Sequence, residues 1–261
     1  MRYFRYRLMI LAGLAVAAST NAAWAQAPEQ LAVGEQRIDG THIQPFEVVW
    51  RQHRFTDQGE EQASNRVVEN VERVEREGET LLRFTQVWYD SLDAVLFTTV
   101  RVADQRTLAY RAFHTGGAPG GFGHLDFNGT HVSGVYVEAP EGPSRYFSLD
   151  LDDQVFASLG GLIYSALPLE LGLEASFPAF GWGGTTNPKQ KQQTYRVLQR
   201  EKVTLPDSYE VDAVKLAINP NAASNLTFWV SREAPYFVRA ESRSASGSLS
   251  VFEIEEWSVT P

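Results

Sequence analysis

Alternation of apolar and polar residues recurs along most of this chain, and this feature restricts the fold more than any other. Phe46, Val48 and Trp50 alternate with polar neighbours. Similar runs are Leu82/Phe84/Trp88 with Gln86 between them, Tyr195/Val197, Tyr209/Val211/Ala213 and Leu226/Phe228/Val230. Successive side chains of a strand point to opposite faces of a sheet, so these runs predict strands with one buried face.

Turn signals separate the runs at short spacing. They are Glu77-Gly78, Asn128-Gly129, Pro206-Asp207, Asn219-Pro220-Asn221 and Ser246-Gly247. Many short strands joined by tight turns are typical of antiparallel sheets. We therefore predict a mainly β fold over residues 46–261. It would be a single domain of strongly curved antiparallel sheet, half-barrel or sandwich-like, with a short helix near residues 153–167.

Residues 65–76 fit two interpretations. Their valines, at positions 67, 68, 71 and 74, form a stripe at helical spacing. A strand that runs into the Glu77-Gly78 turn fits equally well. We favour the strand, because valine is a good strand former and a hairpin partner follows at once.

The helix near residues 153–167 rests on apolar residues at helical spacing. They occupy positions 155, 156, 159, 162, 163, 166 and 167. Asp152 or Asp153 can cap its start, and Pro168 ends it. Gly160-Gly161 lies inside and would weaken a helix by about 1 kcal/mol per glycine relative to alanine. Close packing of this segment against a sheet explains the two glycines.

The N-terminus has the three parts of a secretory signal. Basic residues precede an unbroken apolar run, Leu8–Ala18, and a small-x-small site follows at Ala23-Trp24-Ala25. A membrane helix needs about 20 apolar residues, so this run is too short to be one. We expect cleavage after Ala25, which makes residues 1–25 a signal peptide. Residues 26–45 are polar and predict a loosely ordered lead-in.

Composition excludes several functions. The net charge is −9, and it becomes −12 when the signal peptide takes away three arginines and no acid. An acidic chain repels nucleic acid and anionic lipid surfaces. The absence of cysteine excludes disulfides, thiolate metal sites and a lipidated cysteine. No later stretch is apolar enough to be a transmembrane segment, so we expect a soluble periplasmic protein.

Familiar catalytic motifs are missing. The glycine-rich stretch 116–123 lacks the Lys-Ser/Thr of a phosphate-binding loop, and it predicts a surface loop or the rim of a cavity. His114, His124 and His131 lie around it, and His124 shares a strand face with Asp126. Zinc sites show tighter ligand spacing than this. We therefore predict no metal and no cofactor.

The C-terminal third carries a recognisable pattern. Its parts are Tyr195-Arg-Val197, Glu201, the segment 209–215, Phe228-Trp229-Val230-Ser231, the segment 234–239 and a last strand through Phe252 and Ile254. This pattern resembles the exported bacterial proteins of the domain-of-unknown-function family numbered 3108. The resemblance implies a strongly curved antiparallel sheet, similar in outline to periplasmic lipoprotein carriers. It brings no established catalytic residues.

Three functions follow from this interpretation. The first, which we favour, is a non-enzymatic envelope protein that binds an apolar or amphipathic ligand inside a curved sheet. Candidate ligand-binding residues are Trp88, Trp182, Trp229 and His124. The second is a structural or assembly partner that uses exposed sheet edges. The third is a hydrolase that uses His114, His124 and Asp126.

Overall fold

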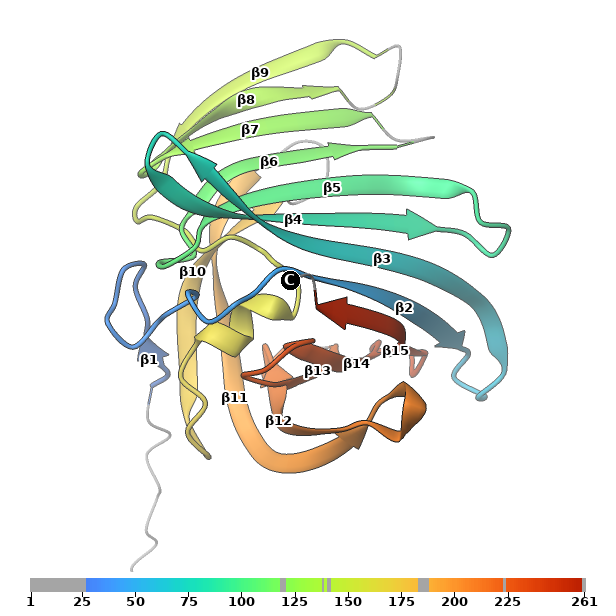
Figure 1. The fold of residues 1–261 in the computed structure, drawn as a ribbon. Coiled ribbons are helices and arrows are strands. Elements are labelled where there is room, and N and C mark those ends of the chain that lie inside the picture. The colour runs from blue at the N-terminus through green and yellow to red at the C-terminus, as the bar shows by residue number, and fades with distance from the viewer. Residues whose placement is uncertain are drawn as a thin grey trace, which may run out of the picture.

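One large antiparallel sheet makes up most of the structure. The computed structural model describes residues 27–117, 121–137, 139, 142–182, 188–222 and 224–259, with the backbone alone at Ala63, Trp182 and Pro188. Within these residues fifteen strands join in a single sheet that does not close (Figure 1). The mainly β fold expected from the sequence is confirmed.

The strands divide into two runs of neighbours. The first run is β2 (Phe46–Phe55), β3 (Glu61–Arg76), β4 (Glu79–Tyr89), β5 (Val95–Asp104), β6 (Tyr110–Gly116), β7 (Phe122–Asn128), β8 (His131–Val137) and β9 (Ser144–Asp150). The second is β10 (Glu174–Trp182), β11 (Pro188–Thr204), β12 (Glu210–Ile218), β13 (Asn225–Val230), β14 (Phe237–Arg243) and β15 (Leu249–Val259). The last strand, β15, pairs with β2 and joins the two runs, while the short β1 (Glu29–Gln30) adds to β10 in parallel.

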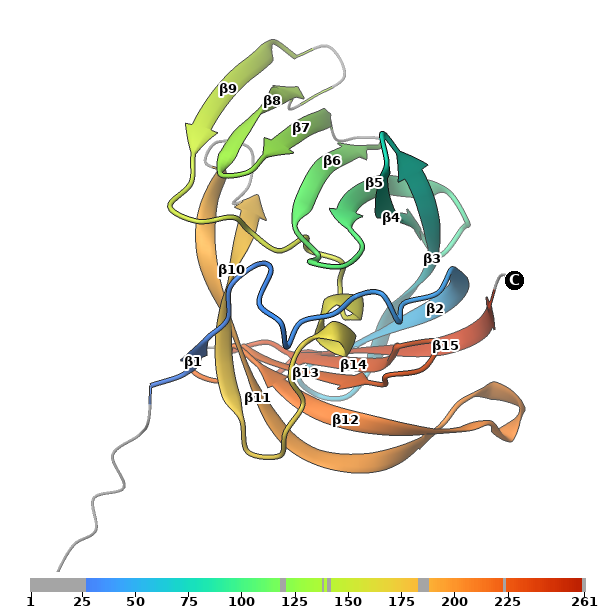
Figure 2. The ribbon, with the colours of Figure 1, turned by 60° about the vertical axis from the view of Figure 1, so that its left-hand side comes forward.

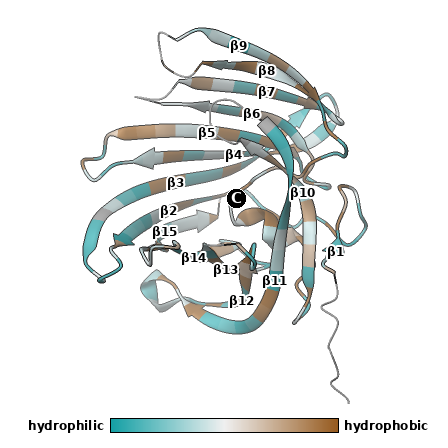
Figure 3. Cartoon of the chain, turned by 180° about the vertical axis from the view of Figure 1, so that it is seen from behind, coloured by the Kyte–Doolittle hydropathy of each residue, from teal (hydrophilic) through white to brown (hydrophobic). Residues whose placement is uncertain are grey.

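The sheet curves around an apolar interior. Hydrophilic and hydrophobic residues alternate along many of its strands (Figure 3). The inward-facing side chains form one continuous core with the segment between β9 and β10, which lies inside the curve of the sheet (Figure 2). The curvature and the alternation therefore have the same cause, which is burial of one face of the sheet.

Residues 65–76 are a strand, as favoured. They belong to β3, which pairs with β2 on one side and with β4 on the other. Val67 and Val71 point inward and are buried. Glu77 and Gly78 have positive φ angles of 54° and 84°, which suits the tight turn that the sequence predicts.

The helix expected near residues 153–167 is much shorter than predicted. Only Leu162–Ala166 is helical, as a 3-10 helix, η1. Gly160 has a left-handed φ of 60° and separates η1 from an extended part. In that part the Phe156 N–H donates to Pro178 O (2.9 Å) and the Ala157 N–H to Leu108 O (2.9 Å). Asp152 and Asp153 lie well before η1, so neither caps it.

The apolar spacing in this segment was misleading because its part from Val155 to Leu167 is buried at every position except Ser158 and Gly160. Apolar residues are then acceptable at every position, and their spacing no longer reports a helix.

The close-packing explanation for the glycines holds at Gly161. A Cβ there would lie 2.1 Å from Cδ2 of Phe237, far inside contact distance. The Arg232 guanidinium holds the same region, because it donates to the carbonyl oxygens of Ser165 and Leu167. The internal segment is thus fixed against strand β14 and the turn that precedes it.

Residues 27–45 are held more firmly than their polar sequence indicates. Leu31, Ile38 and Ile43 are buried in the core. The Tyr236 hydroxyl donates to His42 O (3.0 Å) and accepts from the Gln44 N–H (2.9 Å). Three apolar anchors and one tyrosine therefore attach this stretch to the inside of the sheet.

The expected signal peptide lies outside the described residues. Within the part of the chain that the structure describes, no helix has the length and apolar character needed to cross a membrane.

Candidate functional site

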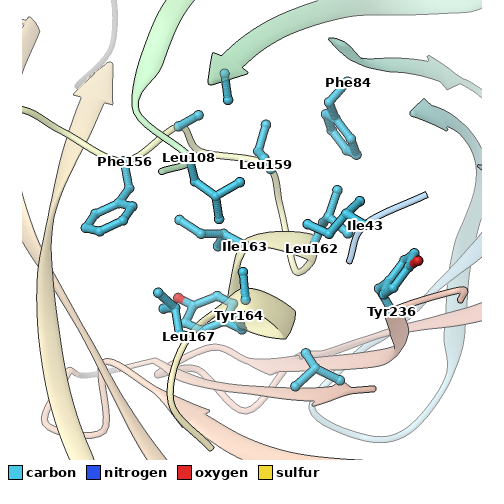
Figure 4. Close-up of a cluster of buried hydrophobic side chains, with 14 of the residues drawn as sticks. Ile43, Phe84, Leu108, Phe156, Leu159, Leu162, Ile163, Tyr164, Leu167 and Tyr236 are labelled. Atoms are coloured by element: carbon cyan, nitrogen blue, oxygen red, sulfur yellow. The ribbon is translucent and has the colours of Figure 1, made fainter. Parts of the chain in front are cut away.

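Two adjoining cavities lie between the internal segment and the sheet. The inner cavity has a volume of about 140 Å³. It is lined by Phe156, Ala157, Ser158, Gly160, Ile163, Tyr164, Phe177, Ala179, Lys191, Gln193, Ile218, Leu226 and Phe228. Figure 4 shows Phe156, Ile163 and Tyr164 together in this interior. Most of the wall is apolar or aromatic, as in sites that bind small organic molecules.

The outer cavity shares Ser158 and Lys191 with the inner one. Its volume is about 260 Å³. The residues that line it are Arg101, Tyr110, Phe113, Ser158, Phe180, Gly181, Lys189 and Lys191. The two walls come from strands β5 and β6 on one side and from β10 and β11 on the other. The site therefore spans two parts of the sheet that are distant in sequence.

Strand β11 sets up a gradient from apolar to charged along the site. Tyr195, Gln193, Lys191 and Lys189 occupy alternate positions, so they share the inner face of the strand. Tyr195 is fully buried, whereas both lysines are exposed. Gly181 lies opposite Lys189 and leaves room for the side chain of Lys191, whose Cδ would be 3.1 Å from a Cβ at that position.

The tyrosines of the site are neutral. Burial raises the pKa of Tyr110 to about 12, although the positive charge of Arg101 acts in the opposite direction. Burial also raises the pKa of Tyr164, against the hydrogen bond with Gln193. These hydroxyls can donate or accept hydrogen bonds but cannot serve as bases near neutral pH.

The four ligand-binding residues predicted from the sequence do not come together at one site. Trp88 lies on β4, with its ring 5.3 Å from that of Phe97 and 5.8 Å from that of Phe252. Trp182 ends β10, and its side chain is outside the description. Neither Trp88 nor Trp229 lines the inner or the outer cavity.

Trp229 has a different environment. Its indole N–H donates to Glu201, Lys215 Nζ lies 4.7 Å from its ring centre, and Arg239 Cζ lies 5.3 Å from it. Phe228, the preceding residue, lines the inner cavity. Because neighbouring strand residues face opposite sides, Trp229 is on the far side of the sheet from the cavity.

The histidine cluster is real but exposed. His124 Nδ1 lies 2.8 Å from His114 Nδ1, and His124 Nε2 lies 2.9 Å from Asp126 Oδ2. Burial and the neighbouring His124 lower the pKa of His114, while Asp126 opposes this. None of the three residues lines either cavity. Within the described ranges, no group of three or more histidine, cysteine, aspartate or glutamate side chains is arranged to hold a metal ion.

His131 lies in a separate row with Asp150 and Ser148. Its Nδ1 is 2.7 Å from Asp150 Oδ1, and Ser148 Oγ is 3.2 Å from its Nε2. This is the order of groups in a hydrolytic triad. However, 46% of the His131 side chain and 86% of that of Asp150 are exposed. An open sheet face does not exclude water or orient a substrate, so the row is a surface hydrogen-bond network.

Sequence reasoning missed the residues that do come together. The alternation of Lys189, Lys191, Gln193 and Tyr195 was a usable signal, since it placed two cations on one strand face. Arg101 and the internal segment gave no comparable signal, because only the tertiary fold brings them to β11.

A buried carboxylate lies in the same interior. Glu69 is 7% exposed. It accepts hydrogen bonds from Trp50 Nε1 (2.9 Å) and Gln86 Nε2 (2.6 Å). Burial raises its pKa, while Gln86, Trp50 and the charge of Arg101 act in the opposite direction.

This carboxylate makes a pH dependence predictable. A raised pKa means that the folded state binds the proton more tightly than the unfolded chain does. The stabilising contribution is complete below the ordinary pKa of 4.5 and is lost as pH rises through the folded-state value. We expect Glu69→Gln to leave stability similar at about pH 4 and to raise the unfolding temperature relative to the wild type at about pH 8. Thermal unfolding followed by circular dichroism across this range measures the effect.

The control is Glu72→Gln on the same strand, where the carboxylate is 44% exposed and paired with Arg83. Glu72→Gln should not raise the unfolding temperature at the higher pH. If Glu69→Gln and the wild type had parallel pH profiles, Glu69 would have the same pKa in both states.

The fold and the cavities define a class: an open, barrel-like antiparallel sheet wrapped around an internal segment. A β-barrel-like protein of the domain of unknown function DUF1849 from Brucella abortus has a similar fold, with a TM-score of 0.52 and 9% identity over 84% of this chain and 99% of that chain. A DUF1329 family protein from Desulfovibrio piger matches at a TM-score of 0.32 and 10% identity, over 84% and 87% of the two chains.

By sequence the chain belongs to the family DUF3108, described as proteins of unknown function. The family model matches residues 46–252. This confirms the resemblance noted in the C-terminal strands. Among curated proteins, none matches this sequence.

Proposed function

We propose that this protein is a non-enzymatic binding protein of the cell envelope, which holds an apolar or amphipathic small molecule in the inner and outer cavities. The observation that carries this proposal is the inner cavity, in which the buried rings of Phe156 and Phe177 and the partly buried ring of Phe228 surround open space. The wall of this cavity is mainly apolar, and sites that bind small organic molecules are mostly apolar with a few polar groups.

The competing functions have weaker support. A hydrolase would need substrate next to its reacting groups, but the His114, His124 and Asp126 cluster is apart from both cavities. An assembly partner could pair with strand β9, which ends the sheet and exposes 82% of Tyr146. This edge supports a second candidate function, addition of a strand from another protein.

Titration with a neutral fluorescent probe, 1-N-phenylnaphthylamine, tests the binding function. We expect saturable fluorescence enhancement at one site per chain, because the transfer of an apolar ring out of water is favourable. The neutral alcohol 4-phenylbutan-1-ol should displace the probe. A linear, non-saturating response would count against a defined binding site.

Export is the second part of the proposal. The signal at residues 1–25 supports cleavage after Ala25. We expect N-terminal sequencing of the protein from a periplasmic fraction to begin at Gln26. A membrane-bound product that retains Arg2 would contradict this.

A further inference from the structure

Positive charge collects at the outer cavity of an otherwise acidic protein. Lys189, Lys191 and Arg101 all line it. Neither cavity has an aspartate or glutamate in its described wall, although the chain as a whole carries a net charge of −9. Three cations brought together without an acid among them repel one another and attract an anion.

Within the described ranges, the two lysines lack partners of opposite charge. Arg101 is partly satisfied, by a hydrogen bond with Tyr110 and by the rings of Phe84 and Phe113. Among the described residues, Lys189 and Lys191 form no ion pair, whereas Lys202 of the same strand pairs with Glu210 at 2.7 Å. Residues 183–187, which precede the two lysines, include no acid. Nη1 of Arg101 is buried with no hydrogen-bond partner. A buried donor without an acceptor destabilises the protein, so an acceptor that reaches this atom would bind favourably.

The carboxylate of Glu69 does not satisfy these groups. It acts on Arg101 electrostatically, but it is not part of either cavity wall. Both its oxygens already accept hydrogen bonds, from Trp50 and Gln86. Lys189, Lys191 and Nη1 of Arg101 are therefore open to an anion from solution.

We infer that the site is selective for a small amphipathic anion, with its apolar part in the inner cavity and its charged group at Lys189, Lys191 and Arg101. This inference rests on the proposed binding function and adds the charge of the ligand. A dry cavity of about 150 Å³ can hold benzene, so the inner cavity, at about 140 Å³, fits a phenyl ring or a short alkyl chain. The outer cavity takes the linker and the carboxylate, sulfonate or phosphate group.

Three phenylalkyl ligands that differ in their polar end group, which is anionic, neutral or cationic, test this inference. They are 4-phenylbutyrate, 4-phenylbutan-1-ol and 4-phenylbutylamine, each titrated by calorimetry into the wild-type protein. We expect the acid to bind at least about tenfold more tightly than the alcohol, because ionised hydrogen bonds are stronger than neutral ones. The amine should bind more weakly than the alcohol. Added salt should weaken binding of the acid most.

Variants locate the effect. Lys189→Gln/Lys191→Gln should lower the affinity for 4-phenylbutyrate much more than the affinity for the alcohol, so that the acid preference falls to the part that Arg101 alone supports. Lys202→Gln, a lysine of the same strand outside both cavities, is the matched control and should change neither.

The outcomes separate the inference from the function on which it rests. Equal affinity for the acid and the alcohol would overturn the inference but leave ligand binding intact. An acid preference as large in the double lysine variant as in the wild type would also overturn it, since the lysines would then not hold the charged group. If inorganic phosphate bound as tightly as 4-phenylbutyrate, the apolar part would be irrelevant and the inference wrong. Absence of binding by all three ligands would remove the proposed function itself.

Discussion

Leu162→Ala is expected to lower the free energy of unfolding by roughly 2–5 kcal/mol. Leu162 is 2% exposed and lies in η1, at the centre of the internal segment. Truncation there removes apolar contacts and leaves a space that fixed neighbours cannot close. Gly161 already packs against Phe237, and Arg232 binds the carbonyl oxygens of Ser165 and Leu167, so the segment has little freedom to collapse into the gap. Urea unfolding followed by circular dichroism measures the loss.

Leu171→Ala is the matched control, because it makes the same truncation in the same connection between β9 and β10 at a side chain that is 60% exposed. It should change stability by no more than about 0.5 kcal/mol. Equal effects of the two substitutions would mean that the internal segment does not fill the sheet as described.

Ala179→Phe is expected to weaken binding of 1-N-phenylnaphthylamine by at least about tenfold. Ala179 lies on β10 opposite Lys191 and lines the inner cavity. A phenyl group there would occupy the space that we assign to the apolar part of the ligand. Extra volume in a packed region costs about 1–3 kcal/mol, so some loss of stability is expected. Thermal unfolding checks that the variant remains folded.

Ala179→Ser keeps the cavity open and serves as the control at the same position. Its affinity for the probe should stay close to that of the wild type. Unchanged binding by a folded Ala179→Phe variant would place the probe somewhere other than the inner cavity.

The local sequence predicted the structure correctly where one face of a strand is buried and the other is exposed to solvent. Val67 and Val71 face the core while Val68 and Val74 are half-buried, and the Glu77-Gly78 turn follows at once. A strand is what this alternation and turn together specify, so residues 65–76 could be interpreted correctly.

The internal segment lay beyond such reasoning. Residues 155–167 are buried at every position except Ser158 and Gly160, so the spacing of the apolar residues does not show which face points inward. The extended part is set by hydrogen bonds from Phe156 and Ala157 to Pro178 and Leu108. Those partners are distant in sequence, and the left-handed Gly160 then prevents one continuous helix.

The candidate site was unpredictable for a related reason. Trp88 and Trp229 were predicted to bind the ligand, but Trp88 packs in an aromatic cluster and Trp229 faces away from the cavity. Phe177, Phe228 and Arg101 reach one site only because the sheet curves. Two lysines on one face of β11 were visible in the sequence, and they are the local signal that marks this site.

Mass spectrometry of small molecules released from the purified mature protein tests the central claim most directly. The protein is purified from the cells that produce it and denatured, and the extract is compared with that of Ala179→Phe prepared in the same way. We predict an anionic amphiphile in roughly stoichiometric amount with the wild type and much less with the variant. A wild-type extract with no enriched compound, or one that matches the variant extract, would contradict the account.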